Sequence, residues 1–378
     1  MKRMKIVSGM RPTGKMHLGH LHGALLNWKD LQEEYDCFYF IADWHALTSE
    51  YARPDIIRES TYDIILDWIS VGLDPEVSTF FIQSEIKEHA ELYLIFSMIT
   101  PLPWLERNPT YKEQLNELSQ KNIYTYGFLG YPVLQAADIL MYKANGVPVG
   151  EDQAPHVELT REIARRFNHL YGDIFPVPKV LLTPTSKLLG IDRRKMSKSY
   201  GNAILLTDGD DEIDQKVDRM ITDPQRARRS DPGDPNVCNV FSFHEIYSDQ
   251  ETTERIRREC PLAGIGCVDC KREMAAALKR GLEPIRAKRR ELESDMDAVK
   301  DIMVEGNRRS RAIARETLAR SRFRPDVHWM LDIPPWRDWM LDAGYWILDI
   351  PPKAGLTLVS PPEAGLSYLG IRSQIRDI

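Results

Sequence analysis

The sequence lacks a long apolar run. No segment approaches the roughly 20 consecutive apolar residues that a membrane-spanning helix needs, and residues 1–5 lead into a short strand-like segment instead of the apolar stretch of a signal peptide. Both absences favour a cytoplasmic protein with no membrane association. The 378 residues, 43% hydrophobic and 28% charged, suffice for a catalytic domain and a smaller second domain.

An excess of positive charge is also lacking, since the formal net charge is −6. Residues 271–324 differ from the rest of the chain, because they hold 16 Lys or Arg against 9 Asp or Glu. An acidic protein with one basic helical region can bind a polyanion there while the rest of its surface repels it. The alternative is an ordinary solvated helix face.

Cysteine is scarce, and its distribution excludes a disulfide framework in a cytosolic chain. Cys37 lies in a strand-like segment and is expected in the core. The other four, Cys238, Cys260, Cys267 and Cys270, are separated by 21, 6 and 2 residues. Four thiolates that include a Cys-x-x-Cys pair are typical of a tetrahedral zinc site or an iron–sulfur cluster, so we predict a metal site.

The order of apolar segments predicts an α/β fold. Short apolar strands alternate with amphipathic helices in the first two hundred residues, which is typical of a doubly wound parallel sheet. From about residue 211 the pattern changes to helices separated by polar linkers. We predict a Rossmann-type catalytic domain over residues 1–205 and a helical domain over 206–324. Strands are expected at 6–10, 38–42 and 79–82, and helices at 20–34, 54–71, 91–99, 132–141, 155–167 and within 274–317.

The end of the chain is repetitive. Residues 329–335 (WMLDIPP) recur at 346–352 (WILDIPP), with a partial copy at 339–342 (WMLD), and four of the eight tryptophans lie in this tail. The paired prolines exclude a continuous helix. We predict a peripheral appendage over residues 325–378 that docks on the body or on a partner.

A glycine- and histidine-containing motif follows the first strand, at residues 13–20 (TGKMHLGH). Gly14 and Gly19 let the backbone approach a bound nucleotide, and a helix N-terminus favours phosphate. His17 and His20 are three residues apart, so both can enter one cleft and donate hydrogen bonds to the α-phosphate during nucleotidyl transfer. Surface histidines would explain the motif about as well.

A second motif, residues 195–199 (KMSKS), places Lys195 and Lys198 beside two hydroxyl groups. Such a loop can neutralise a departing pyrophosphate, because phosphoryl-type chemistry depends on positioning and charge stabilisation. Alone, the motif is equally typical of a solvated loop. Together with residues 13–20, it indicates nucleotidyl transfer.

The two motifs resemble the HIGH and KMSKS signatures of the class I aminoacyl-tRNA synthetases. The resemblance implies a Rossmann-type domain, ATP with Mg²⁺ and an aminoacyl-adenylate intermediate. It assigns catalytic roles to His17, His20, Lys195 and Lys198. The ATP-binding residues that it implies are Gly14, Gly19, Gly150, Asp152, Lys195, Met196, Ser197, Lys198 and Ser199.

Three further stretches resemble bacterial tryptophanyl-tRNA synthetases: residues 131–140 (YPVLQAADIL), 147–153 (VPVGEDQ) and 156–161 (HVELTR). Asp138 lies on an otherwise apolar helix, where its carboxylate is a plausible acceptor for the indole N–H; a local cap or pair is the alternative. The tryptophan-binding residues that the resemblance implies are Val7, Gly9, Tyr131, Gln135, Asp138 and Gln153.

The resemblance covers about residues 4–323 and implies ligation of L-tryptophan to tRNA(Trp). The alternatives are a tyrosine-specific relative, or a non-catalytic protein that senses tryptophan or binds RNA. A minority of the family carries a [4Fe–4S] cluster in the helical domain, and the four cysteines resemble that site, with zinc as the less favoured occupant. The family also implies a homodimer. The basic surfaces that are candidate contacts to tRNA phosphates include Lys271-Arg272, Lys288-Arg289-Arg290 and Arg308-Arg309.

Overall fold

The computed structural model describes residues 3–117, 123–183 and 188–322. The described residues lie in one compact unit, Met1–Arg324. The predicted tail and its repeats lie outside the described residues. None of the described helices is both long and apolar enough to cross a membrane.

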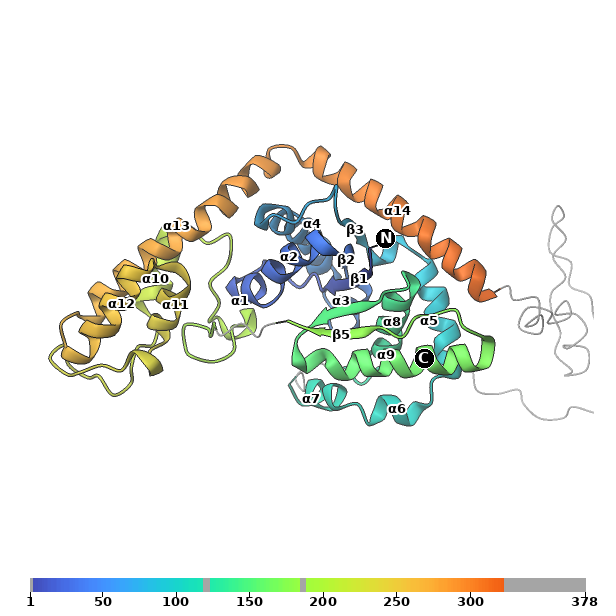
Figure 1. The fold of residues 1–378 in the computed structure, drawn as a ribbon, viewed down its shortest axis with the longest axis horizontal. Helices are drawn as coiled ribbons and strands as arrows, with labels where there is room; N and C mark the ends of the chain where they lie inside the picture. The colour runs from blue at the N-terminus through green and yellow to red at the C-terminus, as the bar shows by residue number, and fades with distance from the viewer. Residues whose placement is uncertain (1–2, 118–122, 184–187, 323–378) are drawn as a thin grey trace, which may run out of the picture. The chain divides into compact units, whose positions relative to one another are not determined.

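Five parallel strands form one sheet in the order β3-β2-β1-β4-β5 (Figure 1). This confirms the predicted Rossmann-type sheet. The strand order reverses beside β1, where Ile6 pairs with Cys37 on one side and with Gly146 on the other. Ligands bind at the carboxyl ends of the strands at such a point. The strands are β1 (Lys5–Met10), β2 (Asp36–Ile41), β3 (Thr79–Ile82), β4 (Gly146–Val149) and β5 (Lys179–Leu182).

The central strands are buried on both faces, and alternate residues belong to different cores. Ile6 and Tyr39 pack in one apolar cluster with α2 (Leu26–Glu34), α4 (Pro54–Val71) and the helices after residue 210. Val7 and Phe38 pack in a second cluster with α5 (Glu88–Ile99), α8 (Tyr126–Met141) and α9 (Ala154–Tyr171). Cys37 is fully buried in the first cluster, as predicted.

Helices cover both faces of the sheet. Helix α4 begins with Pro54 at its first position and ends before Gly72, which has a left-handed backbone conformation. The expected helix at 20–34 is interrupted by a π-helical turn, Leu21–Leu25. The helices are α1 (Leu18–His20), α2 (Leu26–Glu34), α3 (Asp43–Glu50), α4 (Pro54–Val71), α5 (Glu88–Ile99), α6 (Leu102–Glu106), α7 (Pro109–Glu117), α8 (Tyr126–Met141), α9 (Ala154–Tyr171), α10 (Asp210–Asp218), α11 (Asn239–Tyr247), α12 (Gln250–Glu259), α13 (Cys267–Glu293) and α14 (Met296–Arg322).

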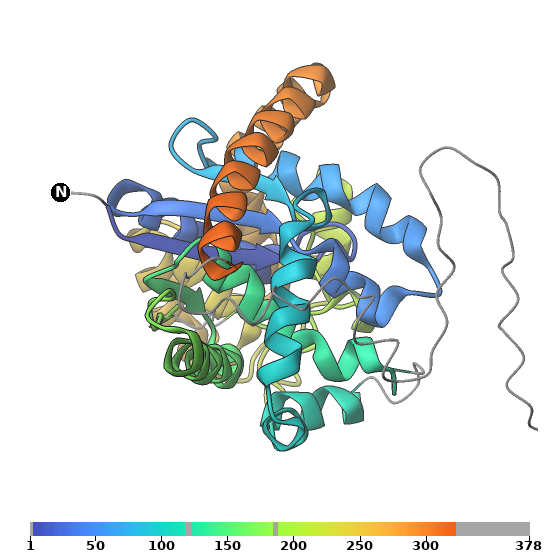
Figure 2. The ribbon, with the colours of Figure 1, turned by 90° about the vertical axis from the view of Figure 1, so that its right-hand side faces the viewer.

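The last helix, α14, packs against the edge strand β3 (Figure 2, orange). A Cβ at Gly306 would lie 1.7 Å from the carbonyl oxygen of Phe80, so only glycine permits this approach. Asn307 Oδ1 accepts the N–H of Ile82 at 2.9 Å, which satisfies a donor on the exposed edge. The last helix of the predicted helical domain thus contacts the sheet.

In the helical region, α10 and α11 pack against α13, and α12 packs against α11. Arg289 of α13 is buried and forms ion pairs with Asp67 at 2.5 Å and Asp63 at 2.6 Å on α4. The expectation that Arg289 contacts tRNA is therefore wrong, because its guanidinium is used inside the protein.

Candidate functional site

A cavity of about 410 Å³ lies at the carboxyl ends of β1 and β4, where the strand order reverses. Its volume is in the range of small-molecule sites. Seven of the predicted site residues line it: Val7, Gly9, His20, Tyr131, Gln135, Gly150 and Gln153. The predicted residues that do not line it are Gly14, His17, Gly19, Asp138, Asp152, Lys195, Met196, Ser197, Lys198 and Ser199.

The two histidines of the first motif form the start of α1. His17 Nδ1 accepts the N–H of Gly19 at 3.1 Å, and His20 Nδ1 accepts the N–H of His17 at 3.2 Å. The ring centroids are 3.8 Å apart. A Cβ at Gly19 would lie 2.9 Å from the His17 ring, so the glycine makes room for this arrangement. Since both Nδ1 atoms accept, the Nε2 atoms of the neutral rings are the donors.

Both histidines are neutral at pH 7. Burial lowers the pKa of His17 to about 4, with a further contribution from the charge of Lys198. Burial lowers the pKa of His20 to about 3, and the neighbouring His17 and Lys198 contribute. A neutral imidazole with a free Nε2–H can donate a hydrogen bond to a phosphoryl oxygen without transferring a proton.

The KMSKS loop, residues 195–199, meets the first motif. Lys198 Nζ donates to the carbonyl of Thr13 at 2.8 Å, and Thr13 lines the cavity. Gly14 has a φ of +106°, which favours glycine, and an added Cβ would lie 3.3 Å from Lys198 Nζ. Burial lowers the pKa of Lys198. The Lys198 side chain of the second motif therefore contacts the backbone of the first motif beside the cavity.

Asn202 holds the KMSKS loop in shape. Its amide donates to the carbonyl of Lys195 at 3.1 Å and to Asp192 at 2.7 Å, and it accepts the N–H of Ser197 at 2.8 Å. Asn202 and Met196 are buried, whereas Lys195 is exposed. The buried asparagine fixes the loop backbone and leaves the Lys195 side chain at the surface.

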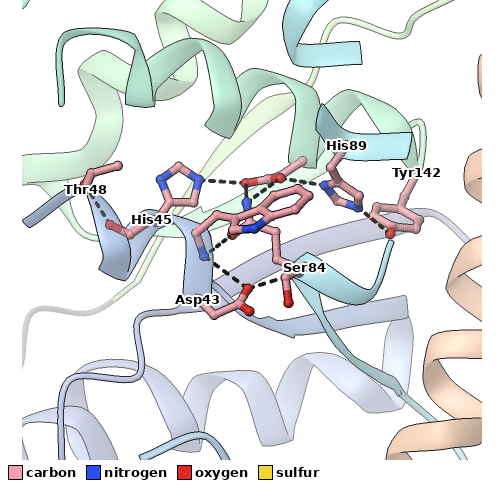
Figure 3. A network of polar contacts seen from close by, with 9 residues as sticks. Asp43, His45, Thr48, Ser84, His89 and Tyr142 are labelled. Carbon is pink, nitrogen blue, oxygen red and sulfur yellow. Dashed lines mark hydrogen bonds and ion pairs between the residues drawn. The ribbon is translucent and has the colours of Figure 1, made fainter. Parts of the chain in front are cut away.

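Asp138 lies at the centre of a buried polar network on α8 (Figure 3). His45 Nε2 is 2.7 Å from one carboxylate oxygen, His89 Nδ1 is 2.6 Å from the other, and the amide of Gln83 donates to both at 2.8 Å. His89 Nε2 contacts the Tyr142 hydroxyl at 2.7 Å. Figure 3 shows His45 and His89 on opposite sides of this network, with His89 next to Tyr142.

This network keeps the Asp138 carboxylate ionised. Burial alone would raise its pKa, but the hydrogen bonds and charges of His45 and His89 outweigh burial and hold the pKa at about 2. Asp138 is fully buried, and the network reaches the cavity through His45. Its predicted contact with indole remains a prediction.

Tyr131 lines the cavity and is held from behind by His156. The Tyr131 hydroxyl lies 2.8 Å from His156 Nε2, and the amide of Asn108 donates to His156 Nδ1 at 3.1 Å. Burial lowers the pKa of His156 to about 4, so the ring is neutral and its Nε2–H donates to the hydroxyl oxygen. The hydroxyl proton of Tyr131 is then left to donate to a bound molecule.

The four cysteines lie near one another but do not form a single-ion site. Burial raises the pKa of Cys270 to about 12, with contributions from the charges of Cys238, Cys260 and Cys267. None of the four is in a disulfide. Within the described ranges, no group of three or more His, Cys, Asp or Glu side chains is arranged to hold a metal ion. The predicted metal site is therefore not confirmed.

Two donors accompany these sulfurs. Arg226 Nη1 lies 3.7 Å from Cys260 Sγ, and its other amino group donates to the carbonyl of Ile265 at 2.9 Å. His244 Nε2 donates to the carbonyl of Cys270 at 3.1 Å and lies 3.4 Å from its Sγ. Donors of this kind stabilise thiolates, as the ligand sulfurs of a metal centre require.

Comparison with known proteins identifies the family. The family of class I tRNA synthetases for tryptophan and tyrosine (W and Y) matches residues 1–283. A tryptophan–tRNA ligase of Thermotoga maritima is 53% identical over 321 residues, covering 84% of this chain and 98% of the relative. The chain belongs to the tryptophan–tRNA ligases. The same relationship holds for the Aquifex aeolicus ligase, at 46% identity and the same coverage. Membership in this family makes the chain an aminoacyl-tRNA ligase.

Solved structures agree. The tryptophanyl-tRNA synthetase of Campylobacter jejuni, in complex with ADP and tryptophan, has a TM-score of 0.77 and 32% identity, and covers 84% of this chain and 98% of its own. A tyrosyl-tRNA synthetase of Archaeoglobus fulgidus, at 23% identity and a TM-score of 0.59, shares the fold; the match covers 76% of this chain and 90% of that one. The tyrosine-specific alternative is not favoured, because the relatives at 46% and 53% identity are tryptophan–tRNA ligases.

Sequence reasoning missed the partners of the site residues. His45 and His89 were not predicted, and nor were Gln83, His156 or Asn202. A signal existed for His156, which lies in one of the stretches that resemble the family. Gln83 and His89 follow β3 and come from segments that show no motif of their own.

Proposed function

We propose that this chain activates tryptophan at the cavity and then loads it onto tRNA(Trp). In the first step the tryptophan carboxylate attacks the α-phosphate of ATP and pyrophosphate leaves; in the second, the tryptophanyl group moves to the terminal ribose of tRNA. The observation that carries the proposal is the contact of Lys198 with Thr13, because it joins the two nucleotide motifs beside a cavity of the right size.

At the phosphate end, His17 and His20 donate hydrogen bonds to the α-phosphate as charge builds up on it. Their neutral rings and free Nε2 donors support this role. Lys195 and Lys198 hold the departing pyrophosphate, and Mg²⁺ bound to ATP neutralises further charge. The remaining ATP contacts that we propose are Gly14, Gly19, Gly150, Asp152, Met196, Ser197 and Ser199.

At the other end, the indole lies among Val7, Gly9 and Gln135, and Tyr131 and Gln153 bind the polar groups of the amino acid. These residues line the cavity, which supports the assignment. We assign Asp138 as the acceptor of the indole N–H. His45, His89 and Gln83 make four contacts with its two oxygens, so the indole N–H takes the place of one of them.

For the four cysteines we propose a [4Fe–4S] cluster held by Cys238, Cys260, Cys267 and Cys270. A zinc ion needs each sulfur about 2.3 Å from one point, whereas the four thiolates of a cluster surround a larger centre at wider spacing. The donors Arg226 and His244 fit either charged centre. When bound, the cluster supplies a rigid cross-link between α11, the segment before α13, and α13 itself.

We further propose that residues 206–324 act as the anticodon-binding domain beside a catalytic domain of residues 1–205, and that the protein works in the cytoplasm, where tRNA is charged. A homodimer is proposed through α5. Leu94 and Met98 are 54% and 75% exposed on that helix, which supports an apolar contact. Phe96, in contrast, is fully buried in the core.

Aminoacylation of a tRNA(Trp) transcript with labelled tryptophan tests the proposed function, with tRNA(Tyr) and the Lys198→Ala variant as controls. We expect acid-precipitable label on tRNA(Trp) alone, and its loss in Lys198→Ala. Tryptophan binding without product, in anaerobically purified protein, would contradict the ligase and favour a tryptophan sensor.

A further inference from the structure

Asn239 joins the cysteine-bearing segment to the KMSKS loop. It follows Cys238 directly, as the first residue of α11, and it is 4% exposed. Its side-chain amide donates to the carbonyl of Gly190 at 2.9 Å, across 49 positions of sequence. Its own Oδ1 has no hydrogen-bond partner among the described residues. The side chain therefore binds Gly190 and does not cap its own helix.

Gly190 transmits this contact to Asn202. A Cβ at Gly190 would lie 2.3 Å from the Asn202 amide nitrogen, so the two residues touch. The next residue, Ile191, donates its N–H to the carbonyl of Asn202 at 3.0 Å. Asn202 in turn fixes Lys195 and Ser197 of the KMSKS loop. A displacement of Gly190 must move the loop or break these hydrogen bonds.

Cys238 governs the position of Asn239. The carbonyl of Cys238 accepts the N–H of Phe241 at 3.1 Å, and this cysteine is the N-cap of α11. Val240 and Phe241 pack in the same apolar cluster as Leu188 and Met196. A hydrogen-bonded path thus leads from the cysteine through Asn239 and Gly190 to the loop.

We propose that Asn239 is a positioning residue that couples the four-cysteine segment to the KMSKS loop. A structural change at the cysteines then alters the affinity for ATP. The coupling rests on the proposed function of that loop. It predicts that a change at Cys238 alters ATP binding although the cavity lies elsewhere. A residue that only satisfied the buried carbonyl of Gly190 would affect stability and leave ATP binding unchanged.

Asn239→Ala tests the coupling, with Asn236→Ala as the matched control. Asn236 lies in the same segment but is exposed, and its side chain contacts only Asp234 among the described residues. ATP–pyrophosphate exchange is measured in the full chain against both substrates. We expect the KM for ATP to rise about 10-fold in Asn239→Ala, with the KM for tryptophan and the Asn236→Ala variant unchanged.

Equal increases in both KM values, or a lower melting temperature with unchanged kinetics, would overturn the coupling. If Asn239→Ala does not fold, Asn239→Ser keeps a polar group but cannot reach Gly190, and the same outcomes apply. Exchange by the wild type with tryptophan tests the proposed function itself, whereas the ratio between variants tests the coupling.

A double-mutant cycle adds a second test. Cys238→Ser is expected to raise the KM for ATP alone, and to add little in the Asn239→Ala background, because both changes break one path. Additive effects of the two substitutions would overturn the proposal, since they would show that the cysteine acts on ATP without Asn239.

Discussion

The histidine pair at α1 and the Asp138 carboxylate on α8 differ in where their hydrogen-bond partners come from. His17 and His20 use backbone partners within three residues and keep a donor on each ring. Asp138 uses His45, His89 and Gln83, which come from three distant segments, and both its oxygens are engaged. The first arrangement can be made by a short motif; the second exists only in the folded protein.

The difference separates groups that are available for catalysis from groups that stabilise the fold. A group that stabilises a transient charge needs unused hydrogen-bonding capacity in the resting protein. A buried carboxylate needs the reverse, because an unpaired buried charge destabilises the fold. Substitutions should therefore affect turnover at the histidines and stability at Asp138.

Asp138→Asn should have the largest effect. It removes the charge that three buried donors share, and we expect the free energy of unfolding to fall by about 3–5 kcal/mol. Urea unfolding followed by circular dichroism measures it, with the exposed Asp30→Asn on α2 as control. A loss below about 1 kcal/mol would mean that the network does not hold the fold.

His17→Asn should separate capping from catalysis. Asparagine still caps the start of α1, so we expect stability within about 0.5 kcal/mol of the wild type. It lacks the Nε2–H, and the rate of ATP–pyrophosphate exchange should fall about 100-fold. His17→Ala, the control, should also lose about 1 kcal/mol of stability. Unchanged exchange in His17→Asn would assign His17 to capping alone.

A third buried histidine, His156, should make the stability of the protein depend on pH. Its pKa is about 4 in the folded protein, below the ordinary value of 6.5, so on acidification the unfolded chain binds a proton first. Stability is present above pH 6.5 and lost as pH falls. Between pH 6.5 and 5 the wild type should lose about 2 kcal/mol more than His156→Gln. An equal shift of the urea unfolding midpoint in the wild type and in His156→Gln between the two pH values would contradict this.

Tyr131→Phe should have the smallest effect. It removes the hydroxyl that is left to donate into the cavity, and we expect the KM for tryptophan to rise about 5-fold with the KM for ATP unchanged. Steady-state exchange measures both, and the exposed Tyr124→Phe is the control. A rise in the KM for ATP instead would place Tyr131 at the nucleotide.

Local signals predicted much of the fold. The helix at 54–71 and the strand at 79–82 match the structure residue for residue, because Pro54 and Gly72 delimit the helix and a short aromatic run forms the strand. The strands β4 and β5 were missed. Each has four residues, and β4 contains Pro148, which lacks a donor for the sheet.

The candidate site divides in the same way. The motifs containing His17 and Lys198 were readable, because each is continuous in sequence. That they meet, and that His45 and His89 pair with Asp138, depends on long-range packing that no single window of sequence contains. The cysteine spacing predicted the proximity of four thiols but could not supply the arrangement around a metal.

ATP–pyrophosphate exchange by anaerobically purified protein, with tryptophan and with tyrosine, tests whether the joined motifs activate tryptophan. The two motifs that meet at the cavity predict exchange with tryptophan alone, lost in Lys198→Ala while tryptophan binding persists. Exchange with tyrosine would contradict the assignment of Asp138 and Tyr131 to tryptophan, and exchange with neither amino acid would contradict the catalytic role of the joined motifs.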